Sequence, residues 1–348
     1  MTEVEQYEAY MKRRPHVVIL GAGASCAAIP NGDRYGKRIS AMSGFLERLG
    51  MKDVLDGITL KTTSDNLEEI HMELDERSTD ELDCQKAKEE LEKRIYNYMS
   101  EFTIPEEPTV YDYLILSLTE KDLIATFNWD PLLVQAMARC MKYTTNIPNF
   151  AFLHGNVAVG YCERDNVIGN VGNICRCGEP LAPIPLLYPI KNKDYTNHIA
   201  ISKAWKTLKN TMEKAYMVTV FGYSAPKSDV EAVSMLKDAW GNLEDRTLEE
   251  IEIVDLRSED EVYESWKDFI FNYHFTYHNN FFDTTLGRCP RRSCEATFDR
   301  LMNCRFLEPN KGFKKGMGFD RIKEQIEDLV AEEYYKKDSG EMLKNPYV

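Results

Sequence analysis

The chain has 348 residues, of which 43% are hydrophobic, so it is long enough to bury a large core in one or two domains. Acidic residues outnumber basic ones by 57 to 43, and the formal charge of −14 argues against direct binding of nucleic acid. No apolar run approaches the roughly 20 residues of a membrane span, and the charged start of the sequence lacks a signal-peptide core. Nine scattered cysteines suggest reduced thiols, so we expect a cytoplasmic protein.

The first informative stretch is HVVILGAGASCAAIPNGDR, residues 16–34. Its apolar run over residues 17–20 is typical of a buried parallel strand. Gly21 and Gly23 then permit a tight turn and a close approach of the backbone to a pyrophosphate, and the Ser25 hydroxyl offers a further donor. An ordinary strand-to-helix turn is the alternative, because a third glycine is missing.

The turn continues into IPNGDR, which adds charged groups beside the glycines. Arg34 is suited to a phosphate or a carboxylate, and together with Asp33 it extends a loop that can close over a ligand. An exposed Asp–Arg pair is also common in solvated loops. The position of the pair beside the glycine turn favours a role in ligand binding.

Helices are expected between this first strand and the rest of the sheet. Apolar residues recur with helical spacing over residues 37–50, and Gly50 is suited to a C-terminal cap. Residues 65–100 are rich in Glu, Lys and Leu, which predicts one or two long helices. They would lie in an insertion over about residues 51–108.

Further apolar runs each end in a polar turn. Residues 109–119 predict a helix, residues 123–126 predict a strand, and Pro131 opens another helix. The strand-like runs FAFLHG, YMVTVFGYSAP and EEIEIVDL follow. This pattern predicts an α/β protein with a doubly wound parallel sheet, whose ligands bind beyond the carboxyl ends of the strands. The residues that follow those ends are Asn128, Asp130, His154, Gly222, Ser224 and Asp255.

Cys162, Cys175 and Cys177 are the cysteines that lie close enough in sequence to suggest shared chemistry. They form a CxC pair with one more distant partner. Three thiolates are one short of the four ligands that a structural zinc site normally has, so no metal is expected. A fourth ligand from a distant Cys or His is the alternative.

The motif order GAGAS with IPNGDR, TFNWD, LHGN and FGYSAP resembles the sirtuin superfamily over roughly residues 15–260. The resemblance implies a Rossmann-like, sirtuin-type domain over residues 1–275, with a C-terminal helical extension over 276–348. It implies that NAD is bound and that Asn128, Asp130 and His154 act on it. The implied NAD-binding residues are Gly21, Ala22, Gly23, Ser25, Pro30, Asp33, Arg34, Gly222, Ser224 and Asp255.

Departures from the family pattern bear on the reaction. Protein deacylases of the family carry two CxxC pairs, whereas the small segment over about residues 160–195 is a degenerate version of that zinc ribbon. Phe127 stands where a glutamine is usual, and FGYSAPKSD is bulkier than the usual turn. These features resemble the bacterial sirtuin-like NADases of antiphage defence, which implies an NAD hydrolase. An NAD-dependent protein deacylase and a non-catalytic sensor of NAD or ADP-ribose are the alternatives.

Cleavage of the bond between nicotinamide and ribose passes through an oxocarbenium-like state. Asn128 can hold the ribose hydroxyls and orient a water, Asp130 can steady the cationic sugar, and His154 can act as general base. Water as the acceptor gives ADP-ribose, whereas an acyl-lysine gives deacylation.

The resemblance also implies a homo-oligomer, or a partner such as a translocase-type ATPase or an Argonaute-like module. The insertion offers apolar residues for such contacts. A lid that folds back over the NAD site of a monomer is the alternative. The apolar residues in question are Leu67, Ile70, Leu74, Leu82, Leu91, Ile95 and Met99.

Overall fold

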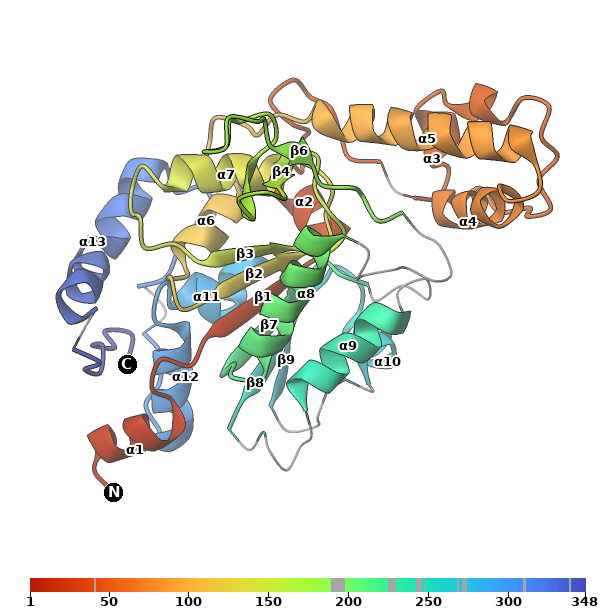
Figure 1. The fold of residues 1–348 in the computed structure, drawn as a ribbon. Coiled ribbons are helices and arrows are strands. Elements are labelled where there is room, and N and C mark those ends of the chain that lie inside the picture. The colour runs from red at the N-terminus through yellow and green to blue at the C-terminus, as the bar shows by residue number, and fades with distance from the viewer. Residues whose placement is uncertain are drawn as a thin grey trace.

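The computed structural model describes the chain except for residues 41, 189–197, 225–229, 242–245, 247, 268, 271–273, 309–310 and 338. At its centre is a six-stranded sheet in which each pair of neighbours is parallel (Figure 1). Across the sheet the strands are β3 (Asn149–Phe152), β2 (Leu123–Thr126), β1 (His16–Leu20), β7 (Met217–Phe221), β8 (Glu250–Val254) and β9 (Phe275–His278). The prediction of a parallel α/β sheet is confirmed.

The strand order changes direction between β1 and β7. In doubly wound sheets the ligand crevice lies outside the carboxyl ends of the strands at such a switch point. The glycine turn at residues 21–23 follows β1 directly, so it lies at that point.

Both faces of the sheet are covered, as the wholly buried β1 requires. Val18 and Leu20 contribute to one core and Val17 and Ile19 to the other, because successive side chains of a strand point to opposite faces. The first core includes residues of α2 (Ala22–Ala28), α6 (Val110–Leu116) and α7 (Leu132–Cys140). The second includes residues of α8 (Ile199–Met212), α9 (Val230–Trp240) and α10 (Glu259–Trp266).

The helical insertion forms an arm that extends away from the sheet (Figure 1). Two long helices, α4 (Leu67–Arg77) and α5 (Leu82–Ser100), confirm the prediction for residues 65–100. The short elements α3 (Phe45–Arg48) and η1 (Lys52–Leu55) precede them.

The predicted helix over residues 37–50 is wrong except at residues 45–48. Gly44 has a left-handed φ of 63°, which is incompatible with a helix that continues through it. Upstream, Asp33 Oδ1 accepts hydrogen bonds from the N–H groups of Tyr35 and Lys37 and so holds the chain in a loop. Gly50, with a φ of 64°, does end the short helical stretch as predicted.

The apolar residues proposed for intermolecular contacts are mostly used inside the molecule. Leu82 is 63% exposed, whereas the other six are buried in the core that includes α4 and α5. They therefore offer no apolar face to a second chain. The oligomeric state stays a prediction without this support.

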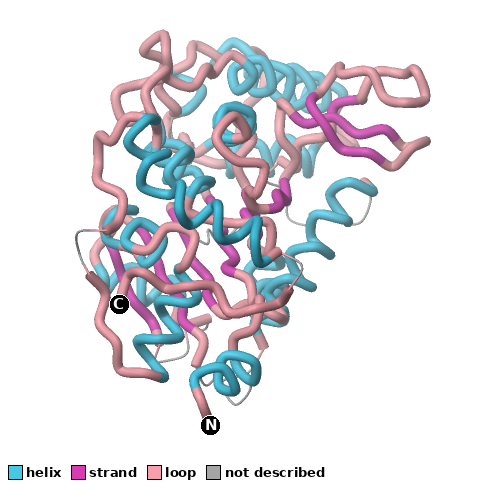
Figure 2. The backbone as a smooth tube through the Cα atoms, turned by 90° about the vertical axis from the view of Figure 1, so that its left-hand side faces the viewer, coloured by secondary structure: helices cyan, strands magenta, loops and turns pink. Residues whose placement is uncertain are grey.

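A smaller antiparallel sheet projects from the body, separate from the central sheet (Figure 2). It contains β4 (Val159–Cys162), β5 (Val167–Asn170) and β6 (Ala182–Pro183), with β4 in the middle. It occupies the predicted small segment, whose residues 189–195 lie outside the described part of the chain.

The C-terminal part completes the sheet before it becomes helical. The boundary predicted at residue 276 falls inside β9, an edge strand whose half-buried residues lack the continuous apolar run of a central strand. The elements η4 (Phe281–Asp283), α11 (Thr285–Arg288), α12 (Ser293–Met302) and α13 (Phe319–Lys336) follow, and α1 (Glu3–Tyr10) begins the chain. Within the described ranges, no helix has the length and apolar character needed to cross a membrane.

Candidate active site

The turn after β1 packs closely against the end of β7. The N–H of Gly21 donates to the last carbonyl oxygen of β7 at 3.0 Å, and that of Gly23 donates to Gly222 O at 2.9 Å. A Cβ atom on Gly21 would lie 2.5 Å from Tyr223 Cα, and one on Gly23 would lie 2.8 Å from Gly222 Cα. The glycines are thus needed to bring two strand ends together, whichever ligand binds there. Ala22 and Gly23 remain exposed on the outer side of the turn.

Ser25 is the centre of a buried hydrogen-bond cluster. Its Oγ lies 2.6 Å from Asp130 Oδ2 and 2.6 Å from the Tyr111 hydroxyl. Asn128 Nδ2 donates to Gly21 O at 2.8 Å, to Ser25 Oγ at 2.9 Å and to the Tyr111 hydroxyl at 3.1 Å. The structure therefore brings together four predicted site residues, Gly21, Ser25, Asn128 and Asp130. Tyr111 joins them from α6, where the apolar sequence gave no sign of a polar role.

The Asp130 carboxylate determines which groups in this cluster donate hydrogen bonds and which accept them. Asp130 accepts the single proton of Ser25, so Tyr111 donates to Ser25 Oγ. Burial raises the pKa of Asp130, and burial together with the charge of Asp130 raises the pKa of Tyr111, so the phenol stays protonated at neutral pH. The Ser25 hydroxyl is 1% exposed and donates inward, whereas the sequence predicted a donor to pyrophosphate.

Asn156 joins the turns that follow β2 and β3. Its Nδ2 donates to Asp130 O at 2.7 Å and to Asn128 O at 3.2 Å, and its Oδ1 accepts the N–H of Ala158 at 2.9 Å. The side chain is buried. These bonds hold the two turns as one unit. The sequence motif LHGN contains this asparagine, but its role becomes visible only when the two turns are seen side by side.

His154 reaches the end of β2 from the side opposite Ser25. Its ring contacts Phe127, with ring centroids 4.7 Å apart and the planes at 74°. Phe127 packs in the core on the α8 side, whereas the partners of Asn128 come from α2 and α6. His154 and Asn128 thus lie at the same edge of the sheet but on the two sides of one strand end. Both are buried.

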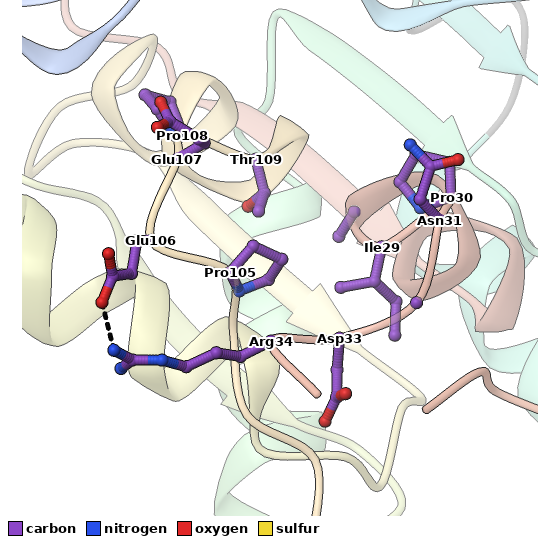
Figure 3. A pocket seen from close by; sticks show the side chains of 12 residues that line it. Ile29, Pro30, Asn31, Asp33, Arg34, Pro105, Glu106, Glu107, Pro108 and Thr109 are labelled. Atoms are coloured by element: carbon purple, nitrogen blue, oxygen red, sulfur yellow. Dashed lines mark hydrogen bonds and ion pairs between the residues drawn. The ribbon is translucent and has the colours of Figure 1, made fainter. Parts of the chain in front are cut away.

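An open pocket of about 650 Å³ lies between the loop after α2 and the segment before α6 (Figure 3). Residues 28–34 and 105–109 line it, which includes Pro30 of the predicted NAD loop. Arg34 extends toward Glu106 and forms an ion pair with it. Glu106 therefore neutralises much of the charge that Arg34 would offer to a phosphate, although the guanidinium keeps further N–H donors.

Asp33 has a structural role in the same loop. Its Oδ2 accepts the N–H of Thr103 at 3.0 Å, while its Oδ1 is held by two N–H groups of its own loop. Both carboxylate oxygens are therefore occupied by the protein. Contact with a ligand, which the sequence predicted for Asp33, would require some of these hydrogen bonds to break.

The ends of β7 and β8 carry the remaining predicted residues. Gly222 has a φ of 63° and Ser224 is exposed, whereas residues 225–229 of the FGYSAPKSD turn lie outside the described chain. Asp255 forms an ion pair with Arg257 at 2.7 Å. Burial on its own raises the pKa of Asp255, but the hydrogen bonds and charge of Arg257 outweigh it and hold the pKa below its usual range. Arg257, which the sequence did not single out, therefore adds a cation at this edge.

The arm meets the site through Tyr188. This ring lies between His71 of α4, with centroids 5.1 Å apart, and Trp129 of the turn after β2, with centroids 5.2 Å apart. Its hydroxyl also donates to Glu92 O at 2.9 Å. The arm is thereby braced against one of the turns that form the site.

The three clustered cysteines gain a fourth neighbour, Asp165. One ligand atom from each of Cys162, Asp165, Cys175 and Cys177 lies within 4.8 Å of the others. The sulfur atoms of Cys162 and Cys177 are 3.6 Å apart, close to the edge of about 3.8 Å of a tetrahedron with zinc–sulfur bonds of about 2.3 Å. The N–H of Asp165 lowers the pKa of Cys162, which favours the thiolate that zinc needs. The backbone N–H of Cys177 lowers the pKa of Cys175, but the hydrogen bond that Cys175 donates to Asp165 helps to raise it to about 12 while no metal is bound. The residues fit a structural metal, and the fourth candidate ligand is an aspartate, not the distant Cys or His named as the alternative from the sequence.

No protein-family model matches the chain, and no curated protein sequence matches it significantly. Among solved structures there are likenesses to sirtuins. A structure on the basis of sirtuin substrate affinity is 16% identical, with 80% of this chain and 93% of that chain covered and a TM-score of 0.38. Sir2 bound to an acetylated peptide is 15% identical, with 87% and 99% covered and a TM-score of 0.37. A mutant Sir2 homologue with ADP-ribose is 14% identical, with 95% and 98% covered and a TM-score of 0.39. Because these sequence identities and TM-scores are low, the function is argued from the geometry of the site.

Proposed function

We propose that the chain is an NAD glycohydrolase, which cleaves NAD to nicotinamide and ADP-ribose. The observation that carries the proposal is the glycine turn at the switch point of the parallel sheet, with Asn128 after β2 and His154 after β3 at the same edge. Sheets with this strand order bind dinucleotides across that point. The resemblance of the sequence motifs to those of sirtuins implies that the bond cleaved is the one between nicotinamide and ribose.

The pyrophosphate and a ribose of NAD each have a counterpart at this edge. The exposed outer side of the turn, at Ala22 and Gly23, lets a pyrophosphate approach the backbone. Asn128 commits its Nδ2 to the buried cluster, and its Oδ1 accepts no hydrogen bond from the residues described, so this oxygen is suited to a ribose hydroxyl. Arg257 and Asp255 supply polar groups at the end of β8.

The chemical step needs an activated water at the anomeric carbon as nicotinamide leaves. His154 is the proposed general base, which takes a proton from that water. Asp130 acts by holding Ser25, and through it Asn128, because both of its oxygens already accept hydrogen bonds. Asp130 is therefore proposed to position Asn128 and not to contact the sugar directly.

The biological role we propose is depletion of NAD in antiphage defence, which rests on the motif resemblance. A homo-oligomer or a partner protein remains part of that proposal. The sequence features that separate this chain from the protein deacylases are the lack of two CxxC pairs, Phe127 in place of a glutamine and the bulkier turn FGYSAPKSD.

The activity is tested by incubating the purified protein with NAD and following nicotinamide, ADP-ribose and cyclic ADP-ribose, with and without an acetylated peptide. We expect nicotinamide and ADP-ribose to form in both samples at the same rate. Release of nicotinamide only with the peptide would assign a deacylase instead, and binding of NAD without turnover would assign a sensor.

A further inference from the structure

Phe127 and Tyr223 form a face-to-face aromatic stack at the site. Their ring centroids are 4.2 Å apart and the planes differ by 12°. Phe127 is the first residue after β2, and Tyr223 follows β7, so the stack spans the end of β1 between them. Two of the features by which the sequence departs from the sirtuin pattern, Phe127 and the turn that contains Tyr223, are thus in contact with each other.

The surroundings hold this stack in place. The N–H of Phe127 donates to Leu20 O at 2.9 Å and continues the pairing of β2 with β1. The backbone of Tyr223 lies against Gly21, where a Cβ would come within 2.5 Å of Tyr223 Cα. Trp205 packs against Phe127 at 6.0 Å between centroids, and Trp266 packs against Tyr223 at 5.9 Å. The Phe127 ring therefore has little freedom to tilt.

His154 contacts this fixed ring. Its imidazole meets Phe127 at 74°, the edge-to-face arrangement that aromatic rings favour. The main chain on either side is fixed as well, because Leu153 O accepts the indole N–H of Trp205 at 3.2 Å and His154 O accepts the N–H of Leu187 at 2.9 Å. The glutamine that is usual at this position could form a hydrogen bond with the imidazole, whereas phenylalanine cannot. Phe127 therefore acts on the imidazole through the shape of its ring.

We propose that Phe127, braced by Tyr223, is a positioning residue that sets the orientation of the His154 imidazole for NAD cleavage. The inference rests on the function proposed above. It predicts that the reaction depends on the ring at position 127 and tolerates a change in its polarity.

The kinetic test compares Phe127→Leu, which removes the ring, with Phe127→Tyr, which keeps it. We expect Phe127→Leu to lower kcat about 10²-fold with little change in KM, because a small displacement of a catalytic group costs about that much. Phe127→Tyr should keep kcat within a few-fold of wild type. The matched control is Phe45→Leu, which removes a fully buried ring from the arm and should leave kcat unchanged.

Tyr223→Leu tests the bracing. We expect it to lower kcat, and the double variant with Phe127→Leu to lose less than the product of the two single losses, since both act through one contact. A Phe127→Leu enzyme with wild-type kcat, or one that changes only KM, would overturn the proposal. Independent losses in the double variant would overturn the role of Tyr223.

A second readout does not depend on activity. The ring protons of His154, one of six histidines, are assigned in the NMR spectrum with His154→Gln. Because loss of the Phe127 ring current shifts these resonances by itself, the readout is the set of nuclear Overhauser contacts between the His154 ring and residues other than Phe127. We expect these contacts to change in Phe127→Leu and to stay the same in Phe127→Tyr and Phe45→Leu. Unchanged contacts in Phe127→Leu would refute the positioning. Changed contacts in a protein that does not cleave NAD would refute the proposed function while the positioning itself stands.

Discussion

Ser25 donates its hydroxyl proton to Asp130 across 2.6 Å, inside the core and between positions 105 residues apart. The serine of the GAGAS motif therefore joins the glycine turn to the turn after β2. The exposed part of the motif, at Ala22 and Gly23, is what a ligand can reach. One short motif thus serves both the fold and the proposed NAD site.

Ser25→Ala should lower the free energy of unfolding by about 1–3 kcal/mol, because it leaves the buried Asp130 oxygen without its donor. Urea denaturation measures the change. Ser100→Ala is the control, since its hydroxyl donates to Tyr96 O at the exposed end of α5. Equal stability of the two variants would show that the Ser25 hydrogen bond contributes nothing.

His154→Ala should lower the rate of NAD cleavage roughly 10²- to 10⁴-fold, the usual cost of removing a general base. Circular dichroism should show an intact fold, because His154 lies after the end of β3. His198→Ala is the control, a histidine that caps α8 by accepting the N–H of Ala200. Turnover near the wild-type rate in folded His154→Ala would remove His154 from the mechanism.

The sequence alone predicts no structural zinc, because three cysteines leave one ligand short. Asp165 supplies the fourth ligand atom, so we expect about one zinc per chain by elemental analysis. Asp165→Ala should lower the zinc content, whereas Glu163→Ala, which changes an exposed acid nearby, should not. Absence of zinc from the wild-type protein after dialysis against zinc would restore the original expectation.

We expect the free energy of unfolding to fall in acid because of His16. Burial lowers the pKa of His16 from 6.5 to about 4. The unfolded chain takes up the proton first as the pH falls, so stability that is fully present above pH 6.5 is lost between pH 6.5 and 4. The loss is about 3 kcal/mol at the usual 1.4 kcal/mol per pKa unit. Urea denaturation over this range should give a flatter profile for His16→Gln, and parallel profiles would contradict the assignment.

Periodicity and strand-end positions predicted much of this architecture. The buried strand at residues 123–126 and the arm helices follow from local patterns, whereas the buried hydrogen bonds of Ser25 with Asn128 and Asp130 were not predicted. The edge strand β9 was not predicted, because a half-buried strand has no continuous apolar run. The false helix over residues 37–50 shows that loop contacts of Asp33 and a left-handed Gly44 can override helical spacing.

Functions that depend on contacts between distant segments could not be predicted from the sequence. Tyr111 lies in an apolar helix, and its hydrogen bond to Ser25 is visible only in the folded chain. The same holds for Asp165 beside the cysteines and for Tyr223 stacked on Phe127. Tyr111 and Asp165 have an ordinary local sequence context. The turn that contains Tyr223 is unusual in sequence, but its contact with Phe127 is visible only in the tertiary structure.

The most direct test of the account is cleavage of NAD in water enriched in ¹⁸O, followed by mass spectrometry of the products. An NAD glycohydrolase that uses water as its acceptor should release nicotinamide and an equal amount of ADP-ribose that carries one ¹⁸O atom. His154→Ala, measured beside it, should form neither product at a comparable rate. Recovery of intact NAD from the wild-type protein, or nicotinamide release that requires an acetylated peptide, would contradict the central claim.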